Sequence, residues 1–336
     1  MWRGGVPSRV KLGTRGSDLA LEQARRVEEA LPYDYDVERV VVETSGDAFE
    51  GDIAELGTQG AFVRELDMRV VEGELNGAVH SMKDMPTERP EGLEVAAVLK
   101  RSPEHDVLVT PEGAELDELD EGTTVGTSSR RRRAQLLRER DDLNVERLRG
   151  NVDTRVKKVV EGEYDAAVLS EAGVDRLGLE VPYTRLPIEG FVPSANQGTV
   201  AVVAVDGTEA FDSIAEADHR RTRVVATAER IVLSRVGGGC IAPIGVHARI
   251  EGDRIRLRAD VLSTDGGESV SLDRRYPVES YIEGAEEMAG EMVDRGADEL
   301  LRAASEGQTK DPVSRSSGLT TTAPNAARRL RGNADS

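Results

Sequence analysis

The spacing of apolar residues changes about two-thirds of the way along the chain, and this change limits the folds that the chain can adopt. Before it, short apolar runs such as 77–80 alternate with amphipathic stretches such as 61–72, which is the rhythm of strands and helices in an α/β fold. After it, residues 254–261 alternate polar and apolar side chains without a break, which predicts an antiparallel strand with one solvated face. We therefore expect an α/β region followed by a small C-terminal α+β domain.

The α/β region is expected to contain two units. Its strands are predicted at 10–13, 37–42, 77–80, 107–109, 124–126, 145–148, 166–169 and 199–205. Helices are expected over 18–31 (with Ser17 as N-cap), over 61–72, from near Ser129 and Ser170, and over 281–304 in the C-terminal domain. The segment 199–205 comes long after the first unit has closed, so we expect it to return there, which would give two connections between lobes and a hinge.

Charge and cysteine content narrow the range of functions. The net charge is -19, from 63 acidic and 44 basic residues, which opposes nucleic-acid binding and membrane attachment. No apolar run approaches the roughly 20 residues that span a bilayer, and the N-terminus lacks an apolar signal core, so we expect a cytoplasmic protein. Cys240 is the only cysteine, which excludes an internal disulfide and, with four histidines, argues against a structural zinc site.

Only six of the basic residues are lysines. Excess acid with scarce lysine is consistent with adaptation to high salt, and an ordinary acidic protein is the open alternative. A salt titration of folding separates the two, because full stability in salt-free buffer would argue against the salt hypothesis.

Arginines stand at the ends of several predicted strands. Residues 128–133, Ser-Ser-Arg-Arg-Arg-Arg, lie where a strand ends and a helix begins, and the free N–H groups of a helix start favour an anion. Guanidinium groups add donors suited to carboxylates, and open α/β sheets place ligands at these strand ends. Comparable positions are held by Arg15, Arg149, Arg155 and Arg176. The pattern predicts a site for a small molecule with several negative groups.

A second interpretation of the arginine run stays open. Such runs are also typical of a solvated or nucleic-acid-facing patch, and helical spacing cannot direct four consecutive side chains at one ligand. Arg130 and Arg133 fit both interpretations equally well. For Arg131 and Arg132 the shared strand-end position favours a binding site.

Two further segments could carry chemistry. Lys83 and Asp84 follow the predicted buried strand 77–80, and a carboxylate there could transfer protons or stabilise a developing cation; a surface ion pair is the alternative. We expect His80 to be a packed strand residue. In Gly-Gly-Gly-Cys (237–240), the glycines would leave the Cys240 thiol accessible to nucleophilic or covalent chemistry, whereas an inert buried cysteine is the commoner case. No phosphate-binding or dinucleotide glycine fingerprint occurs.

Several motifs occur in an order that resembles the porphobilinogen deaminase (hydroxymethylbilane synthase) family, from about residue 10 to 304. They are Gly-Thr-Arg-Gly-Ser (13–17), Gly-Ala-Phe-Val-Arg-Glu-Leu (60–66), His-Ser-Met-Lys-Asp-Met-Pro (80–86), Gly-Thr-Ser-Ser-Arg-Arg-Arg (126–132), Leu-Arg-Gly-Asn-Val-Asp-Thr-Arg (148–155), Ala-Gly-Val-Asp-Arg-Leu-Gly-Leu (172–179), Asn-Gln-Gly (196–198), Thr-Ala-Glu-Arg (227–230) and Gly-Gly-Cys-Ile-Ala-Pro-Ile-Gly (238–245).

The resemblance implies a fold and an activity. The fold would have two periplasmic-binding-protein-like α/β lobes with a hinge, plus the C-terminal α+β domain. The expected bounds are 9–99 with 197–215 for the first lobe, 104–192 for the second and 218–304 for the third domain, with 305–336 a disordered tail. The activity would join four porphobilinogen molecules head to tail, with loss of ammonia, on a dipyrromethane cofactor, and water would release hydroxymethylbilane for tetrapyrrole synthesis. A monomer that passes its product to a downstream tetrapyrrole enzyme is expected.

The resemblance also implies residue roles. Asp84 matches the carboxylate that contacts the pyrrole N–H groups and stabilises a cationic intermediate. Cys240 would hold the cofactor by a thioether bond. Cofactor contacts are matched by Lys83, Ser128, Ser129, Arg131, Arg132 and Arg155, and substrate contacts by Arg15, Ser17, Phe62, Arg149 and Arg176.

One departure from the family concerns a loop before the 60–66 segment. Glu55 and Gln59 stand where the family often carries lysines, so this loop would gather carboxylates with less positive charge. A solute-binding protein is the main alternative to an enzyme, but it predicts an export signal and no cysteine loop. A nucleic-acid-binding module is weaker, because aromatic residues make up only 3% of the chain.

Overall fold

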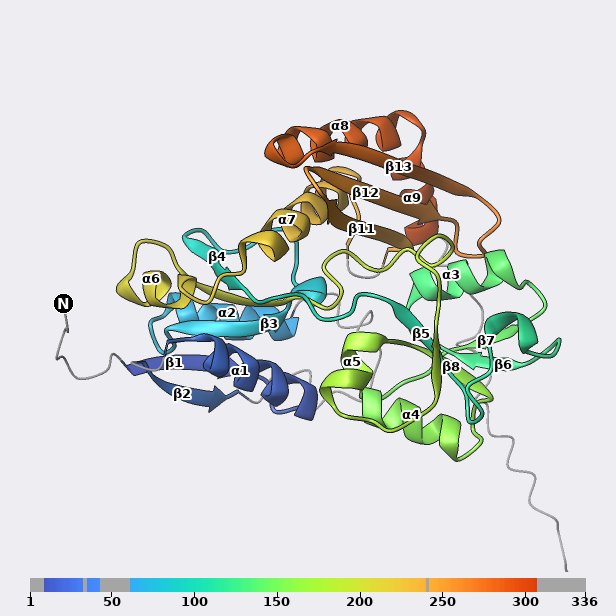
Figure 1. Cartoon of the computed structure of the whole chain (residues 1–336), viewed down its shortest axis with the longest axis horizontal. Coiled ribbons are helices and arrows are strands. Elements are labelled where there is room, and N and C mark those ends of the chain that lie inside the picture. Colours follow the sequence, from blue (N-terminus) through green and yellow to red (C-terminus); the bar gives the residue numbers. More distant parts are fainter. Residues whose placement is uncertain (1–8, 33–34, 43–60, 240–241, 307–336) are drawn as a thin grey trace, which may run out of the picture.

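The structure is a computed structural model that describes residues 9–32, 35–42, 61–239 and 242–306, with Ala61 and Phe62 described by their backbone alone. Two α/β lobes lie side by side, and a C-terminal sheet with its helices lies above them (Figure 1). Of the helices in these described ranges, none combines the length and apolar character needed to cross a membrane.

The first lobe is built on a five-stranded sheet in the order β2-β1-β3-β10-β4. Its strands are β1 (Arg9–Thr14), β2 (Asp36–Val41), β3 (Gly77–Ser81), β4 (Leu93–Val98) and β10 (Val200–Val205). The helices of this part of the chain are α1 (Asp18–Ala30), α2 (Ala61–Val71) and α6 (Glu209–Ala215). The late strand β10 runs antiparallel between β3 and β4, which confirms the predicted return of this segment to the first unit.

The second lobe repeats this architecture with the order β7-β6-β8-β5-β9. Its strands are β5 (Asp106–Val109), β6 (Thr124–Gly126), β7 (Asn144–Glu146), β8 (Ala166–Ser170) and β9 (Tyr183–Arg185). Its helices are α3 (Arg130–Glu139), α4 (Val152–Val160) and α5 (Glu171–Arg176), with a short 3-10 turn, η2 (Leu116–Glu118). The parallel strands β6 and β8 lie side by side, so their C-terminal ends present the following helix starts at one edge of the sheet.

The C-terminal domain is a three-stranded antiparallel sheet of β11 (Ile244–Glu251), β12 (Arg254–Leu262) and β13 (Ser269–Pro277). The apolar residues of the alternating strand β12 pack in one core with α7 (Arg220–Arg235), α8 (Tyr281–Asp294) and α9 (Ala297–Glu306). A 3-10 turn, η3 (Val278–Ser280), leads into α8. The predicted sheet covered by helices is therefore confirmed.

Two sequence expectations about element bounds were wrong. The single helix predicted over 281–304 is divided into α8 and α9, because Gly296 adopts a φ of 86°, which ends a helix. The strand predicted over 145–148 ends at Glu146. The predicted tail lies outside the described residues, apart from its first two positions, which end α9.

The two segments that connect the lobes run side by side. The backbone N–H of Ser102 donates to the carbonyl of Gly198 (3.0 Å). Gly198 has a φ of 81°, and an added Cβ would lie 2.5 Å from the Ser102 carbonyl oxygen. Only glycine allows this approach without displacing the neighbouring backbone.

A buried carboxylate ties the connecting segments to the C-terminal domain. Glu229 of α7 has no exposed surface and accepts from Arg101 Nη1 at 2.6 Å. The same carboxylate accepts from the backbone N–H groups of Asn196 (2.5 Å) and Ala248 in β11 (2.7 Å). Since one side chain joins both connections to the third domain, the three parts share a common junction.

Candidate active site

The predicted catalytic carboxylate lies in a short turn at the end of a buried strand. Asp84 closes the 3-10 turn η1 (Met82–Asp84), which follows β3 directly, and its side chain is exposed. Lys83 beside it is half-buried. The strand that precedes them is fixed by His80, whose Nε2 lies 2.9 Å from Asp67 Oδ1 in the core. His80 is therefore a packed strand residue, as the sequence predicted.

Charged groups of the second lobe act on the residues of this turn. Burial lowers the pKa of Lys83 to about 8; the nearby charges of Arg132 and Arg131 also lower it, while Asp84 and Asp106 raise it. Burial also lowers the pKa of Arg155, to about 10, with Arg132 lowering it further and Asp84 raising it. Asp84 and Lys83 of one lobe thus share a field with cations of the other.

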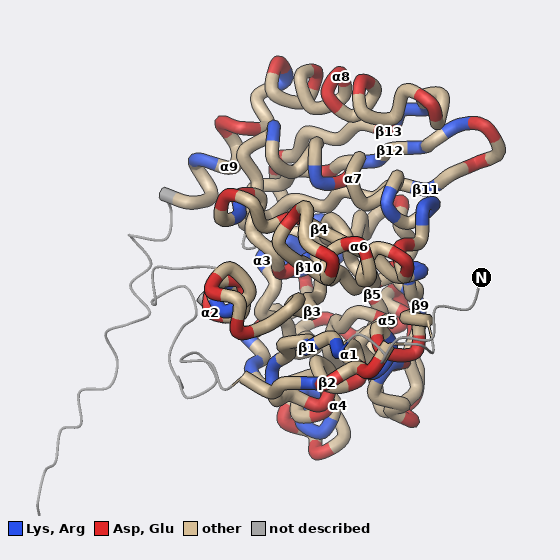
Figure 2. The backbone as a smooth tube through the Cα atoms, turned by 90° about the vertical axis from the view of Figure 1, so that its left-hand side faces the viewer, with Lys and Arg blue, Asp and Glu red and all other residues tan. Residues whose placement is uncertain are grey.

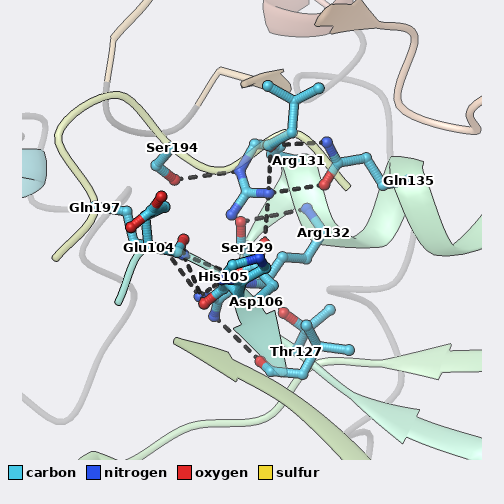
Figure 3. A network of polar contacts seen from close by, with 12 residues as sticks. Glu104, His105, Asp106, Thr127, Ser129, Arg131, Arg132, Gln135, Ser194 and Gln197 are labelled. Carbon is cyan, nitrogen blue, oxygen red and sulfur yellow. Dashed lines mark hydrogen bonds and ion pairs between the residues drawn. The ribbon is translucent and has the colours of Figure 1, made fainter. Parts of the chain in front are cut away.

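Two consecutive arginines at the start of α3 converge on one carboxylate, as Figure 3 shows. Arg131 is only 2% exposed, and its Nη1 donates to Asp106 Oδ2 at 2.7 Å. Arg132 Nε donates to Asp106 Oδ1 at 2.9 Å. Gln197 Nε2 adds a third donor to the same carboxylate at 2.9 Å. Burial raises the pKa of Asp106, but the two arginines and these hydrogen bonds outweigh burial and hold it below the usual range.

Further contacts hold the two guanidinium groups in place. Arg131 also donates to Gln135 Oε1 (2.7 Å), the Val192 carbonyl (2.8 Å) and Ser194 Oγ (3.2 Å). Arg132 also donates to the Val168 carbonyl (3.1 Å) and Gln197 Oε1 (3.3 Å). Arg131 Nη2 is buried and has no hydrogen-bond partner among the described residues. A buried charged donor without a partner is costly, so this nitrogen is suited to an acceptor supplied by a ligand.

The other residues of the arginine run serve different contacts. Arg133 is exposed and donates from Nη1 to the Val145 carbonyl on β7. Ser129 is the N-cap of α3 and accepts from the Arg132 N–H (3.4 Å), while Ser128 donates to the Leu148 carbonyl. The helix start predicted near Ser129 is confirmed. The cofactor contacts predicted for Ser128 and Ser129 stay predictions.

The predicted substrate contacts are spread more widely. Arg176 is buried, and its Nη2 donates to the Gly198 carbonyl (2.7 Å) and Ser102 Oγ (3.1 Å) of the connecting segments. Burial lowers its pKa to about 10, and the charges that modify it are Arg26 and Glu22 of α1. Arg176 therefore lies at the junction between the lobes, and the groups that act on its charge are not those that act on Lys83 and Arg155.

Three more of these residues occupy turns. Ser17 is the N-cap of α1 and accepts from the Ala20 N–H (3.4 Å), as predicted. Arg15 is half-buried in the turn before it, and Arg149 is exposed after β7. Arg155 is half-buried and donates from Nε to the Gly150 carbonyl at 2.8 Å.

Glycines lie between the end of α7 and the predicted cofactor cysteine. Gly237 has a φ of 82°, and a Cβ added at Gly238 would lie 2.7 Å from Leu233 Cδ1. The positive φ therefore favours glycine at position 237, and a larger residue at position 238 would require the Leu233 side chain to shift. Cys240, Glu55, Gln59 and the side chain of Phe62 lie outside the described residues.

Two family models match the chain, one before and one after residues 214–223. The porphobilinogen deaminase, dipyromethane cofactor binding domain, matches residues 10–213, and the porphobilinogen deaminase, C-terminal domain, matches residues 224–300. The chain belongs to the porphobilinogen deaminase family. Its activity is that of a hydroxymethylbilane synthase, a transferase of tetrapyrrole synthesis.

Relatives of the family share most of this chain. A probable porphobilinogen deaminase of Methanococcoides burtonii is 47% identical over 297 residues, 87% of this chain and 96% of that protein. A probable porphobilinogen deaminase of Halobacterium salinarum is 38% identical, over 87% of this chain and 97% of its own. Among solved structures, the methionine binding protein MetQ is similar to 63% of this chain and 90% of its own, with a TM-score of 0.40 and 12% identity. The family match favours the enzyme over the solute-binding alternative.

The residues present fit a porphobilinogen deaminase cofactor. The family model describes a dipyrromethane-binding domain, and each pyrrole ring carries acetate and propionate groups. The buried, unpartnered Arg131 Nη2 and the half-buried Arg155 supply donors for such carboxylates. Sequence reasoning missed Asp106 and Gln197 as members of this site. The only available signals were an acid directly before the apolar run 107–109 and the Asn-Gln-Gly segment.

Proposed function

We propose that Asp84 is the catalytic carboxylate and that the arginines of the second lobe hold the carboxylates of the cofactor and the growing chain. The observation that carries this proposal is the shared electrostatic field of Asp84, Lys83, Arg132 and Arg155, which come from both lobes. Porphobilinogen loses ammonia to give an electron-poor pyrrole that becomes cationic. An exposed carboxylate beside several cations can stabilise that charge without being neutralised by one fixed partner.

The arginines have a complementary role. Arg131, Arg132 and Arg155 would bind the acetate and propionate groups of the cofactor, with Lys83, Ser128 and Ser129 as further contacts. Because Asp106 fixes Arg131 and Arg132 before any ligand arrives, little side-chain entropy would be lost on binding. Arg15, Ser17, Phe62, Arg149 and Arg176 would act in substrate binding or chain growth. For Arg176 the effect would come through the junction that it contacts.

Attachment of the cofactor is assigned to Cys240 by a thioether bond. When bound, the dipyrromethane supplies the free pyrrole end to which four porphobilinogen units are joined. Support for this assignment comes from the glycines at 237 and 238, which follow the end of α7, and from the absence of any other cysteine in the sequence. We further propose a cytoplasmic monomer that passes hydroxymethylbilane to a downstream tetrapyrrole enzyme.

Intact mass measurement tests the attachment. Purified protein should exceed its polypeptide mass by two joined pyrrole units, and the Cys240→Ser variant should show the bare mass. A bare mass for the parent protein would mean either that the preparation lacks its cofactor or that the assignment is wrong. Incubation with porphobilinogen separates these two explanations. If the parent gains no adduct under those conditions, the assignment of Cys240 is wrong.

A further inference from the structure

A cavity of about 520 Å³ lies between the first lobe and the C-terminal domain. It is lined by Met82 of η1 and residues that follow η1, by β4, by one face of α7 and by Glu286 of α8. Four arginines line it: Arg89, Arg223, Arg230 and Arg235. Among the residues that the structure describes, two acidic ones, Glu94 and Glu286, share the lining. This excess of positive charge contrasts with the chain as a whole, whose acidic residues are spread along outer helices such as α2, α6 and α8 (Figure 2).

Close carboxylate partners among the described residues hold Arg223 and Arg235. Arg223 Nε lies 2.8 Å from Asp218 Oδ2, and Arg235 Nη2 lies 2.8 Å from Glu286 Oε1. Arg89 differs, because its ion pair with Glu94 is long at 3.5 Å. Its Nη1 is buried and has no hydrogen-bond partner among the residues that the structure describes. This nitrogen exposes almost no surface, so an acceptor in the cavity would reach it only after the Arg89 side chain shifts, and would then supply the missing hydrogen bond.

The helix face that borders the cavity is polar where packing would require apolar residues. Arg223, Thr227, Arg230 and Ser234 follow one another at intervals of three or four residues along α7 and all line the cavity. A helix stripe packed against a neighbouring lobe is normally apolar. With Thr87 opposite, this stripe instead offers hydroxyl and guanidinium donors from both sides of the cavity.

One of these arginines also contacts the segment that carries Asp84. Arg230 donates to the carbonyl of Met85 at 3.4 Å and to the carbonyl of Pro86. These are the two residues after Asp84. An anion bound by Arg230 would therefore act on the backbone next to the proposed catalytic carboxylate without touching the carboxylate itself.

We propose that this cavity binds a small anion with two or more carboxylate or phosphate groups, at a site separate from the active site. Planar guanidinium forks and hydroxyl donors are the groups that recognise such anions. Of the proposed cofactor and substrate contacts whose side chains the structure describes, none lines the cavity. The bound anion would join the first lobe to α7 and so stabilise the contact between these two parts.

Isothermal titration of the cofactor-loaded protein tests the proposal, with citrate and pyrophosphate as probes at constant ionic strength. We expect Arg89→Met to weaken binding of at least one probe about tenfold or more, since it removes a charged donor. The matched control Arg302→Met changes an arginine of α9 paired with Asp298 and should bind like the parent. Thr227→Val should also weaken binding, and it replaces Arg89→Met in the test if that variant does not fold.

A further variant distinguishes binding in the cavity from binding in the active site. Arg155→Met removes a proposed cofactor contact, so binding in the cavity should persist in it. The proposal is overturned if neither probe binds the parent, if Arg89→Met and Thr227→Val bind like the parent, or if Arg155→Met abolishes all binding. If Arg89→Met and Thr227→Val lose binding of citrate alone, the site recognises carboxylates. If they lose binding of pyrophosphate alone, it recognises phosphates.

Discussion

The acid and the paired arginines of the proposed active site come from different lobes and differ in exposure. The first lobe supplies Asp84, an exposed carboxylate in a short turn, whereas the second supplies Arg131 and Arg132, which are buried and already paired with Asp106. An exposed acid can approach successive reacting units, while preorganised cations hold carboxylates at fixed positions. The contrast suggests that charge stabilisation and chain positioning are separated between the lobes.

Removal of the exposed carboxylate should have the largest effect. We expect Asp84→Ala to reduce turnover by about 10³-fold or more, because the developing positive charge loses its stabilising partner. The protein should still fold and still carry its cofactor, as intact mass would show. Glu88→Ala, an exposed acid in the same segment, is the matched control and should retain activity. Near-normal turnover in Asp84→Ala would refute the assigned role.

Loss of the buried carboxylate should act on stability first. Asp106→Asn leaves two buried guanidinium groups without their counter-charge, which costs roughly 3–5 kcal/mol. Urea unfolding would measure this loss, and mass spectrometry would show reduced cofactor loading. Asp142→Asn breaks the more exposed pair with Arg140 and should have a much smaller effect, because solvent screens exposed ion pairs. Equal effects of the two substitutions would contradict the special importance of the buried ion pairs of the second lobe.

The pH dependence of substrate binding tests the charge of Lys83, a first-lobe residue that is affected by charges of the second lobe. The pKa of Lys83 is lowered to about 8, so its positive charge is lost as the pH rises through that value. We expect KM for porphobilinogen to rise by up to about tenfold between pH 7 and pH 9.5, since the charged fraction falls with each unit above the pKa. Lys83→Arg keeps its charge in this range, so its KM should remain flat.

The same shift has a consequence for stability. Because the folded pKa of Lys83 lies below its value of 10.5 in the absence of interactions, the unfolded chain binds more protons between these values. Lys83 therefore lowers stability below pH 8, and this cost is relieved as the pH rises from about 8 toward 10.5. Thermal unfolding of the parent and of Lys83→Met over this range should converge as the pH increases; parallel curves would contradict the assignment.

The smallest expected effect concerns a helix cap. Ser17→Ala removes the acceptor for the Ala20 N–H and should lower the free energy of unfolding by about 1 kcal/mol. If Ser17 acts only as a cap, KM should not change. An increase in KM larger than the stability loss explains would support the proposed substrate contact.

Local patterns predicted much of the fold. The caps Ser17 and Ser129 and the return of 199–205 to the first lobe depend on residue types and spacing that are visible in the sequence, and the structure confirms them. The division of the last helix at Gly296 was not predicted, because a glycine within a helical pattern is compatible both with one continuous helix and with two shorter ones.

The candidate site was less predictable, since its geometry depends on contacts between distant residues. The arginines could be found because they cluster at strand ends, but Asp106 could not. Its partners Arg131 and Gln197 are 25 and 91 residues away. The position of Arg176 at the junction likewise depends on Gly198 and Ser102, and no local pattern indicates such a contact.

The insertion of β10 between β3 and β4 also determines when each lobe can form during synthesis. All strands of the second lobe lie within residues 106–185, whereas the first lobe needs residues 200–205 to close its sheet. Until those residues leave the ribosome, β3 and β4 present unpaired edges. The second lobe, although later in the sequence, is therefore the first that can fold completely, and the nascent first lobe is the part most exposed to aggregation.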